Sequence, residues 1–341
     1  MSNGGVLRRP AVPPSVRIRR DVNKLPANDP VITFYEKAIG VMQDSNRKLD
    51  DPLNWRYQAA IHDYPDPDAT LADRLRDPRD PAKVDRDPSA KSSDVLPPDR
   101  STFWRQCQHG SWFFLSWHRM YLHHFEKIVM SIVAQLPGGP SDWALPYWNY
   151  SSSAAAALLP APFRNPTLPD KTTNHLFVAE RTPNANAGGA FLDEPDTNLD
   201  CLKAKSFANA LGFGGPKVRH HPSRGSPPGR VEQTPHNPIH GALGGATGFM
   251  GFFSTAPLDP MFWLHHCNID RLWEVWVQRQ KQLGNLDRNP MKEGPWLDEQ
   301  FAFRDATGRR VDMTSRQVLN TRLAPLSYEY EDTSDPFKGL P

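Results

Sequence analysis

The sequence predicts a mainly α-helical protein: a four-helix bundle core that holds a two-metal centre, with long irregular loops and a few short strands. Apolar residues recur at helical spacing in several segments. Six of the 12 histidines fall in short tracts inside or beside those segments. Proline accounts for 35 of 341 residues, whereas 10 Trp and 17 Phe supply a large aromatic core. Rigid loops around an aromatic core are the natural interpretation.

Length and composition bound the function before any motif is considered. The 341 residues are enough for one large domain or two modest ones. A net charge of +2 gives no reason to expect a nucleic acid or a membrane as partner. No apolar run reaches the roughly 18 residues that a spanning helix needs.

The first twenty residues are basic but have no apolar h-region, so no secretory signal is expected and a cytoplasmic location is favoured. Three cysteines cannot form a disulfide framework.

The predicted elements run in order from an extended arm over residues 1–30. Apolar spacing predicts a helix over 31–49 and a short one over 53–62, just after Pro52. Residues 63–100, rich in Asp, Pro and Arg, are expected to form a surface excursion. The strongest helical pattern covers 110–136 and ends at PGG.

The second half begins with a long loop over 151–230, rich in Ala, Pro and Gly. A helix is predicted to begin near His236, and another to cover about 259–282. Short strands and turns are expected over 296–333. Helices that converge on metal ligands are a known helix-bundle arrangement.

The histidine tracts carry the chemical signal. His236 and His240 are one turn apart, so both rings project from one helix face. His109 and His118 are nine residues apart, and each of these spacings alone is a weak signal. The pair at 265–266 lies in an apolar helix, where an unpartnered ring is costly to bury and a metal would remove the cost. Imidazole-only sets suit copper, zinc, iron or nickel.

Three tracts together resemble a known family. HGSWFFLSWHRMYLHHFE, EQTPHNPIH and DPMFWLHHCNIDRLW are similar to the signatures of tyrosinases and catechol oxidases, the type-3 copper proteins that include molluscan haemocyanins. The resemblance runs from about Arg19 to Tyr330. It implies a single tyrosinase-like catalytic domain over residues 1–341, with a core of about 19–330, two copper ions, and O2 as co-substrate.

The resemblance also implies the copper ligands. For the first copper they are His62, His109 and His118, and for the second His236, His240 and His266. His62 is assigned because no other histidine precedes His109. The remaining histidines are expected outside the ligand set: His265 behind the ligands, His123 and His124 in packing or surface positions, and His175, His220 and His221 in solvated loops.

Cys107 lies two residues before His109. In several fungal relatives a cysteine at this spacing is joined to the ligand histidine by a thioether, and the resemblance favours that bond over a buried free thiol. Cys267, after His266, is expected only to pack.

Glu232 and Asn237 flank the first ligand of the second copper. In relatives this pair is proposed to hold a water that takes the phenol proton. The alternative is a loop carboxylate and a helix-capping amide.

Three further residues have expected places around the metals. Phe253 is expected as a gate over one copper, and Phe262 as a ring packed on His266. Asp270 either orients a ligand imidazole through a hydrogen bond or pairs as scaffold with Arg271 or an N-terminal arginine.

The tract SYEYED, with Tyr328 and Tyr330, resembles the Tyr-x-Tyr segment that ends the family's catalytic core. Only 11 residues follow Tyr330, so a core without a C-terminal lid domain is expected. Arg19 or Arg20 is predicted to stack on one of these tyrosines.

The predicted function is therefore a tyrosinase, a monooxygenase and polyphenol oxidase that converts monophenols and o-diphenols to o-quinones with O2. A catechol oxidase or an o-aminophenol oxidase without the monophenol step is the alternative. A haemocyanin-like oxygen carrier is a more distant one, and a binuclear hydrolase would use bridging carboxylates. Small phenols and O2 are the expected partners, with a copper chaperone as a further candidate. The sequence leaves the natural phenol and the oligomeric state open.

Overall fold

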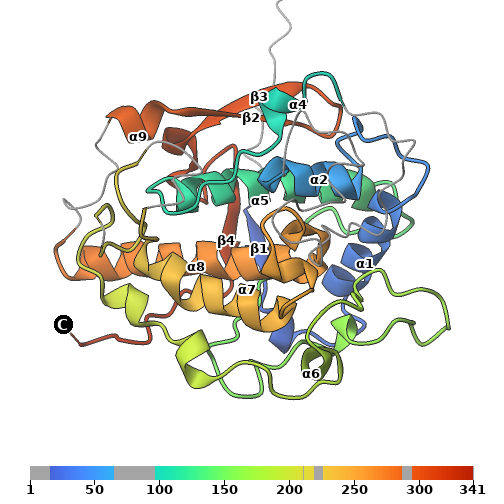
Figure 1. Cartoon of the computed structure of the whole chain (residues 1–341), viewed down its shortest axis with the longest axis horizontal. Helices are drawn as coiled ribbons and strands as arrows, with labels where there is room; N and C mark the ends of the chain where they lie inside the picture. The colour runs from blue at the N-terminus through green and yellow to red at the C-terminus, as the bar shows by residue number, and fades with distance from the viewer. Residues whose placement is uncertain (1–15, 65–96, 210, 219–225, 286–293, 341) are drawn as a thin grey trace, which may run out of the picture.

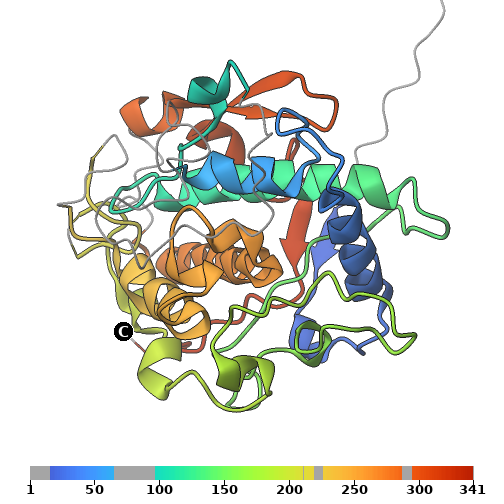
Figure 2. The ribbon, with the colours of Figure 1, turned by 45° about the vertical axis from the view of Figure 1, so that its right-hand side comes forward.

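Four helices form the centre of the molecule (Figure 1). A computed structural model describes residues 16–64, 97–209, 211–218, 226–285 and 294–340. The central helices lie as two pairs, α2 (Trp55–His62) with α5 (Phe114–Val133), and α7 (Asn237–Gly244) with α8 (Pro260–Gln282). Figure 2 shows the same two layers after rotation. The predicted mainly helical fold is confirmed.

The helix starts follow from their capping residues. Asn54 accepts hydrogen bonds from the amides of Arg56 and Tyr57 at the start of α2. Asp259 does the same for Met261 at the start of α8, where Pro260 occupies the first turn. Such side chains satisfy amides that lack a partner inside the helix. The predicted starts at 53 and 259 are therefore correct to within two residues.

One predicted helix is shorter than expected. α1 begins at Pro30, capped by Asp29, and ends at Met42 instead of residue 49. Beyond it, Asp44 accepts from the amide of Asn46, and this side chain–backbone bond favours a turn over further helix. α1 packs against α5.

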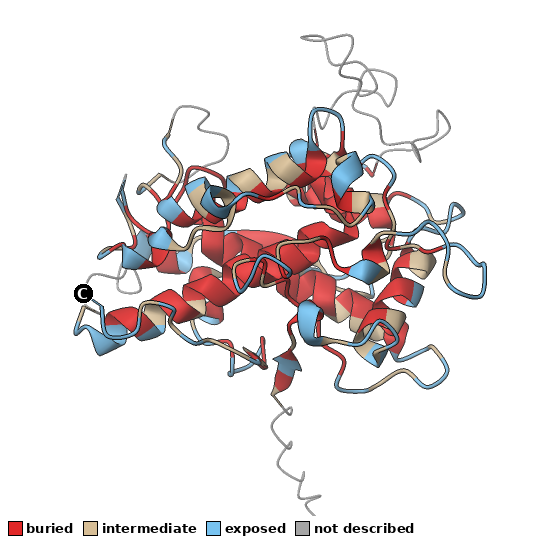
Figure 3. Cartoon of the chain, turned by 90° about the horizontal axis from the view of Figure 1, so that it is seen from below, coloured by how far each residue is buried: buried red, intermediate tan, exposed pale blue. Residues whose placement is uncertain are grey.

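The described part of segment 151–230 is irregular, as predicted, but it contains short helical turns in which buried residues are interspersed with exposed ones. Figure 3 shows that the buried residues of the chain are concentrated in the central helices and the exposed ones at the periphery. The short α-helices of the described chain are α4 (Arg100–Phe103), α6 (Pro183–Asn186) and α9 (Gly294–Asp298). Its 3-10 turns are Val22–Lys24, Ala161–Phe163, Glu194–Thr197, Asp200–Lys203, Phe249–Gly251, Ala256–Leu258 and Ser315–Val318. Most of the predicted excursion at 63–100 lies outside the described residues.

Two small sheets complete the fold. β1 (Arg17–Arg19) pairs in parallel with β4 (Tyr328–Tyr330), so segments from opposite ends of the chain lie side by side. β2 (Gln300–Arg304) pairs antiparallel with β3 (Arg310–Thr314). The predicted stacking is confirmed for Arg19, whose guanidinium carbon lies 3.6 Å from the ring centre of Tyr328.

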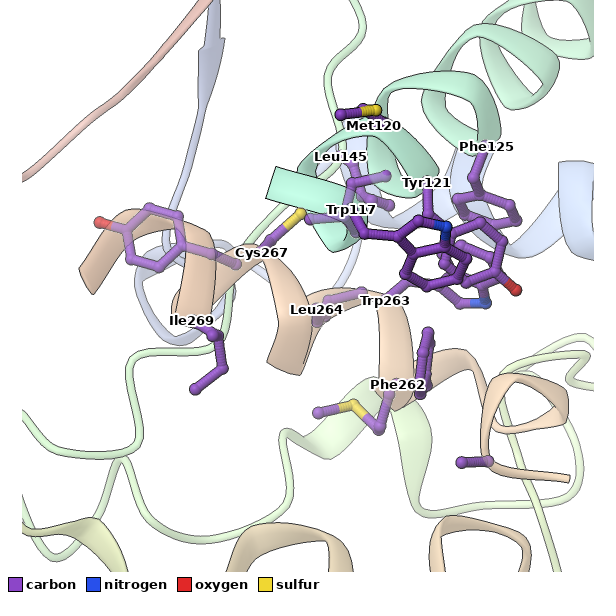
Figure 4. Packing of buried hydrophobic residues seen from close by; sticks show 14 of the residues in the cluster. Trp117, Met120, Tyr121, Phe125, Leu145, Phe262, Trp263, Leu264, Cys267 and Ile269 are labelled. Carbon is purple, nitrogen blue, oxygen red and sulfur yellow. The ribbon is translucent and has the colours of Figure 1, made fainter. Parts of the chain in front are cut away.

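Aromatic side chains fill the space between α5 and α8 (Figure 4). Trp263 stacks on Phe125 with ring centres 3.4 Å apart, and Tyr121 lies 4.7 Å from Trp263. All three are buried. Among the described residues, no helix combines the length and the apolar composition that a membrane crossing needs.

A buried set of charges ties β1 and β4 to the bundle. The Glu126 carboxylate accepts from Arg17 at 2.9 Å and from Arg19 at 3.1 Å. It also accepts from the amide of Leu145 at 2.9 Å. Burial alone would raise the pKa of Glu126, but the two guanidinium groups and the hydrogen bonds hold it at about 2.

This low pKa makes stability pH-dependent. The ionised carboxylate favours the folded state fully above the ordinary glutamate pKa of about 4.5, and the contribution is lost as pH falls toward about 2. We therefore predict that Glu126→Gln lowers the free energy of unfolding at pH 7 by about 3 kcal/mol, because it leaves buried guanidinium charge uncompensated. Urea unfolding of the metal-free protein at a series of pH values measures this.

The difference between the two proteins should shrink between pH 4.5 and 2, since protonation removes the same charge in the unmodified chain. Glu180→Gln, at an exposed carboxylate, is the matched control and should change little. An equal loss at every pH would show that the negative charge of Glu126 is not what stabilises the fold.

Candidate metal centre

The first histidine set forms where three segments meet. His62 is the last residue of α2, and His118 lies on α5. Residues 105–107 donate backbone hydrogen bonds to the carbonyls of residues 60–62, which holds the segment carrying His109 against the end of α2. The ring centres are 5.3 Å apart for His62 and His109, 5.5 Å for His62 and His118, and 5.2 Å for His109 and His118.

The second set comes from α7 and α8. A π-helical turn, Glu232–His236, leads into α7 and places His236 beside His240 with ring centres 4.5 Å apart. His266 on α8 lies 5.0 Å from His236 and 5.5 Å from His240.

The two sets face each other. His118 stacks on His266 with ring centres 4.4 Å apart and planes 11° from parallel, and His109 lies 5.7 Å from His236. The structure thus brings together all six histidines that the sequence predicted as ligands.

Main-chain carbonyls fix the tautomers of three rings. Nδ1 of His62 lies 2.7 Å from the Phe253 carbonyl, and Nδ1 of His118 lies 2.7 Å from the Phe114 carbonyl. Nδ1 of His240 lies 2.8 Å from the Met250 carbonyl. A carbonyl oxygen can only accept, so each Nδ1 carries the proton, and Nε2 of the neutral ring presents a lone pair.

For His62 and His118, both Nε2 atoms carry lone pairs, and they lie 3.4 Å apart. Nε2 of His240 and Nε2 of His266 are 3.3 Å apart, and Nδ1 of His266 has no hydrogen-bond partner among the described residues that would fix its tautomer. Nε2 of His236 is buried and has no hydrogen-bond partner among the described residues. Two facing lone pairs repel, whereas a metal cation accepts both. The donor set therefore fits metal ions that prefer imidazole.

Burial keeps the second set in the ligand form. It lowers the pKa of His240 to about 4 and the pKa values of His236 and His266 well below 6.5, and neighbouring histidines add to the last two effects. All three rings are neutral at physiological pH, as metal ligation requires.

Glu232 is buried next to the first set. Its two oxygens accept from the amide of Gly110, at 3.1 and 2.9 Å. Burial raises its pKa to about 8, and amide donors from Gly110 and Gly229 reduce that rise. Asn237 is exposed at the start of α7, and its Oδ1 lies 2.9 Å from Nδ1 of His236. It contacts a predicted ligand directly and forms no side-chain cap of α7.

Two phenylalanines surround the rings. Phe253 is 53% exposed, and its ring centre lies 4.7 Å from that of His109 and 6.4 Å from that of His62. Phe262 is fully buried, 4.2 Å from His266 and 5.1 Å from His62. Phe253 thus covers the first set from the outside, and Phe262 packs beneath both sets.

Cys107 is a buried thiol in contact with the first set. Its sulfur and one ring nitrogen each of His62 and His109 lie within 4.8 Å of one another. Burial raises the pKa of this thiol well above its usual value, and Asp63 and Glu232 add to the effect.

Asp270 belongs to the scaffold. Its carboxylate accepts from Arg119 at 2.5 Å, from Tyr328 at 2.6 Å and from Tyr330 at 2.5 Å, and Arg19 lies at 3.5 Å. These contacts match the scaffold alternative, with Arg19 as the predicted N-terminal arginine. Arg271, the other candidate, binds Asn268 and Asn149 instead.

The other histidines divide into several groups. His123 and His124 are buried, and His124 stacks on Phe303 at 4.6 Å, as packing residues do. His175 lies in a loop and is partly exposed, and its Nδ1 lies 2.9 Å from Oε1 of Gln43. Positions 220 and 221 lie outside the described residues. His265 is buried against the second set.

Sequence patterns did not reveal the three carbonyl partners, because any residue type supplies a carbonyl. Gly110 was also missed. Its φ of +57° and the Ser226 oxygen, which would lie 2.9 Å from an added Cβ, explain a glycine directly after His109.

Comparisons with known proteins agree with this geometry. Residues 52–279 match the family described as the common central domain of tyrosinase, and residues 291–338 match the polyphenol oxidase middle domain. The tyrosinase HcTyr1 of Hahella sp. is 35% identical over 333 residues, which cover 92% of this chain and 63% of that protein. A chloroplastic polyphenol oxidase of Malus domestica is 33% identical over 67% of this chain and 39% of its own length.

Solved structures show the same fold. The latent apple tyrosinase superposes with a TM-score of 0.67 at 26% identity, covering 97% of this chain and 65% of that one. A polyphenol oxidase of Grenache grape, Vitis vinifera, gives 0.64 at 22% identity, covering 97% and 94%. The chain spans less than two thirds of HcTyr1 and of the apple polyphenol oxidase.

The facing lone pairs predict a specific response to metal ions. Zn²⁺ or Cu²⁺ should raise the melting temperature of the metal-free protein, because an ion bound only by the folded state stabilises it. Mg²⁺ should not, since it prefers oxygen ligands. Calorimetry with and without each ion measures the shift.

His118→Phe should reduce the zinc-dependent shift, whereas His123→Phe, at a buried histidine on the same helix, should leave it intact. Equal shifts in the two variants would argue against the first histidine set as a metal site.

Proposed function

This chain belongs to the tyrosinase and polyphenol oxidase family, and we propose that it oxidises phenols with O2 at a centre of two copper ions. The observation that carries the proposal is the pair of facing three-histidine sets, whose ring nitrogens present lone pairs toward a common space. Metal analysis after copper loading tests it directly. Two copper ions per chain are expected, and His62→Ala should lose copper.

The proposed ligands are His62, His109 and His118 for one copper, and His236, His240 and His266 for the other. The copper ions would supply O2 binding and the oxidising power. Neutral imidazoles suit this task because they hold copper in both common oxidation states without adding charge.

The position of the Glu232 carboxylate supports redox chemistry over hydrolysis. Both Glu232 oxygens are bonded to the Gly110 amide, so this carboxylate does not stand among the ring nitrogens as a bridging ligand would. Binuclear hydrolases commonly use such bridges.

We propose that the substrate enters over Phe253. This ring is half-exposed and lies on His109 and His62, so a phenol approaching the first set would stack on it or displace it. Small phenols are therefore the proposed substrates.

Glu232 is the proposed proton acceptor for a monophenol. Burial makes its carboxylate a stronger base than an ordinary glutamate, with a pKa of about 8, close to the operating pH of a general base. Asn237 orients His236 by accepting from its Nδ1, and its amide group can also hold a water near that ring. A catechol needs this base less, since its adjacent hydroxyl groups give it two oxygens with which to bind the metals.

Monophenol oxidation is thus proposed, with catechol oxidation or o-aminophenol oxidation alone as the alternative. Glu232→Gln should lower the rate on a monophenol by about tenfold to a thousandfold and affect a catechol much less, by the usual worth of general base catalysis. Oxygen uptake with tyramine and with catechol, at matched copper content, measures both rates. The Asn237→Gly variant is assayed on the same two substrates as Glu232→Gln.

Comparing the two substrates distinguishes a role of Glu232 in proton transfer from a structural role. If both rates fall together, Glu232 shapes the site without handling a proton. If the unmodified protein oxidises only catechols, the monophenol proposal is wrong.

We also propose that Cys107 forms a thioether with His109. The buried sulfur already lies within 4.8 Å of a His109 ring nitrogen, and a bond to the ring would pin His109, which lies on an irregular segment. Its formation removes two hydrogens, for which O2 is the available oxidant.

Copper-matured protein should therefore have an intact mass about 2 Da below the sequence mass, and Cys107→Ser should restore the full mass. Alkylation under denaturing conditions should modify Cys201 and Cys267 and miss Cys107. Complete alkylation of all three would rule the bond out.

A further inference from the structure

His265 is a buried imidazole without a settled partner. It is completely buried, and neither ring nitrogen has a hydrogen-bond partner among the described residues. Leaving both nitrogens unsatisfied in the interior is costly. The ring nevertheless lies beside two proposed copper ligands, with its centre 5.3 Å from His236 and 5.0 Å from His240.

The second set therefore has four members. One ring nitrogen from each of His236, His240, His265 and His266 lies within 4.8 Å of the other three. Nitrogen ligands at about 2.0–2.1 Å from a metal in a tetrahedral arrangement are about 3.3 Å apart. Small side-chain movements suffice to bring any three of these nitrogens onto one ion.

The two candidates for the third ligand lie on different sides. His266 faces the first histidine set and stacks on His118 at 4.4 Å. His265 instead faces Tyr150, whose ring centre is 5.7 Å away. An ion held by His236, His240 and His265 would therefore lie farther from the first set than an ion held by His266.

We propose that His236, His240 and His265 form an alternative binding site for the second copper ion, farther from the first copper. The ion can occupy this site in place of the site formed by His236, His240 and His266. The proposal rests on the proposed function, since it takes the two-copper centre as given. The alternative site would hold a copper ion that is not magnetically coupled to the other one.

The His266→Ala variant tests the alternative site. The full-length variant loaded with Cu²⁺ should still bind about two copper ions per chain, because three imidazoles remain. Bridged Cu²⁺ ions couple their spins and give no EPR signal, whereas isolated ions do. The unmodified oxidised protein should thus be nearly EPR-silent, and His266→Ala should show a signal that accounts for most of its copper.

Removing both His265 and His266 should leave the second copper ion without a complete binding site. The double variant His265→Ala, His266→Ala should bind about one copper ion, whereas His123→Ala, His266→Ala, which loses a buried histidine elsewhere, should keep two. One copper ion in His266→Ala with a native circular dichroism spectrum would overturn the proposal.

A second variant guards against a folding defect in His266→Ala. His265→Phe, which keeps the full set of proposed ligands, should bind two EPR-silent copper ions. Loss of one copper ion in His265→Phe would show that His265 is a ligand in the unmodified protein and would contradict the alternative site. A wild-type protein that binds fewer than two copper ions would instead contradict the proposed function, so the two failures are distinguishable.

Discussion

The hydrogen bonds from ring nitrogens to main-chain carbonyls determine what this site can do. The carbonyls of Phe253, Phe114 and Met250 each accept a hydrogen bond from the Nδ1–H of one histidine, so the lone pairs of these three rings lie on Nε2 and face the common space. A side-chain acceptor could rotate away, whereas a carbonyl is fixed by its own backbone. The tautomers are thus set by the fold before any metal binds. In the metal-free protein the facing lone pairs repel one another. A bound cation relieves this repulsion, which makes the free energy of metal binding more favourable.

The same centre depends on a charged scaffold directly behind the rings. Arg119 follows His118 on α5, and Asp270 lies one turn after His266 on α8, so their 2.5 Å ion pair joins the two helices beside the stacked rings. Such a buried pair is costly to desolvate, and Tyr328 and Tyr330 supply the additional donors that offset the cost. These tyrosines belong to β4, which is held in place by its pairing with β1. The β1–β4 pairing therefore helps to fix the distance between the two histidine sets.

The sequence predicted the parts of the site that local spacing encodes. His236 and His240 at one-turn spacing, and the pair on the apolar helix, required only helical periodicity and a resemblance to be placed. The Asp270 contacts could not be chosen in advance, because whether its carboxylate meets a ligand or an arginine depends on the rotation of α8 against α5. His175 shows the same limit, since its contact with Gln43, 132 residues away in the sequence, could not be predicted from the loop around it.

Phe253 joins access to ligand geometry in a single residue. Its ring lies over His109 at the surface, while its carbonyl accepts from Nδ1 of His62. The ring can move on its own rotamers, but a displacement of its backbone would also release the His62 tautomer. A substrate that only turns the ring therefore leaves the ligands in place, whereas one that pushes the segment aside weakens the first histidine set. Under the proposed function, the size of phenol that the site could accept would thus be limited by the hydrogen bond that orients His62, as well as by the space above the proposed metal ions.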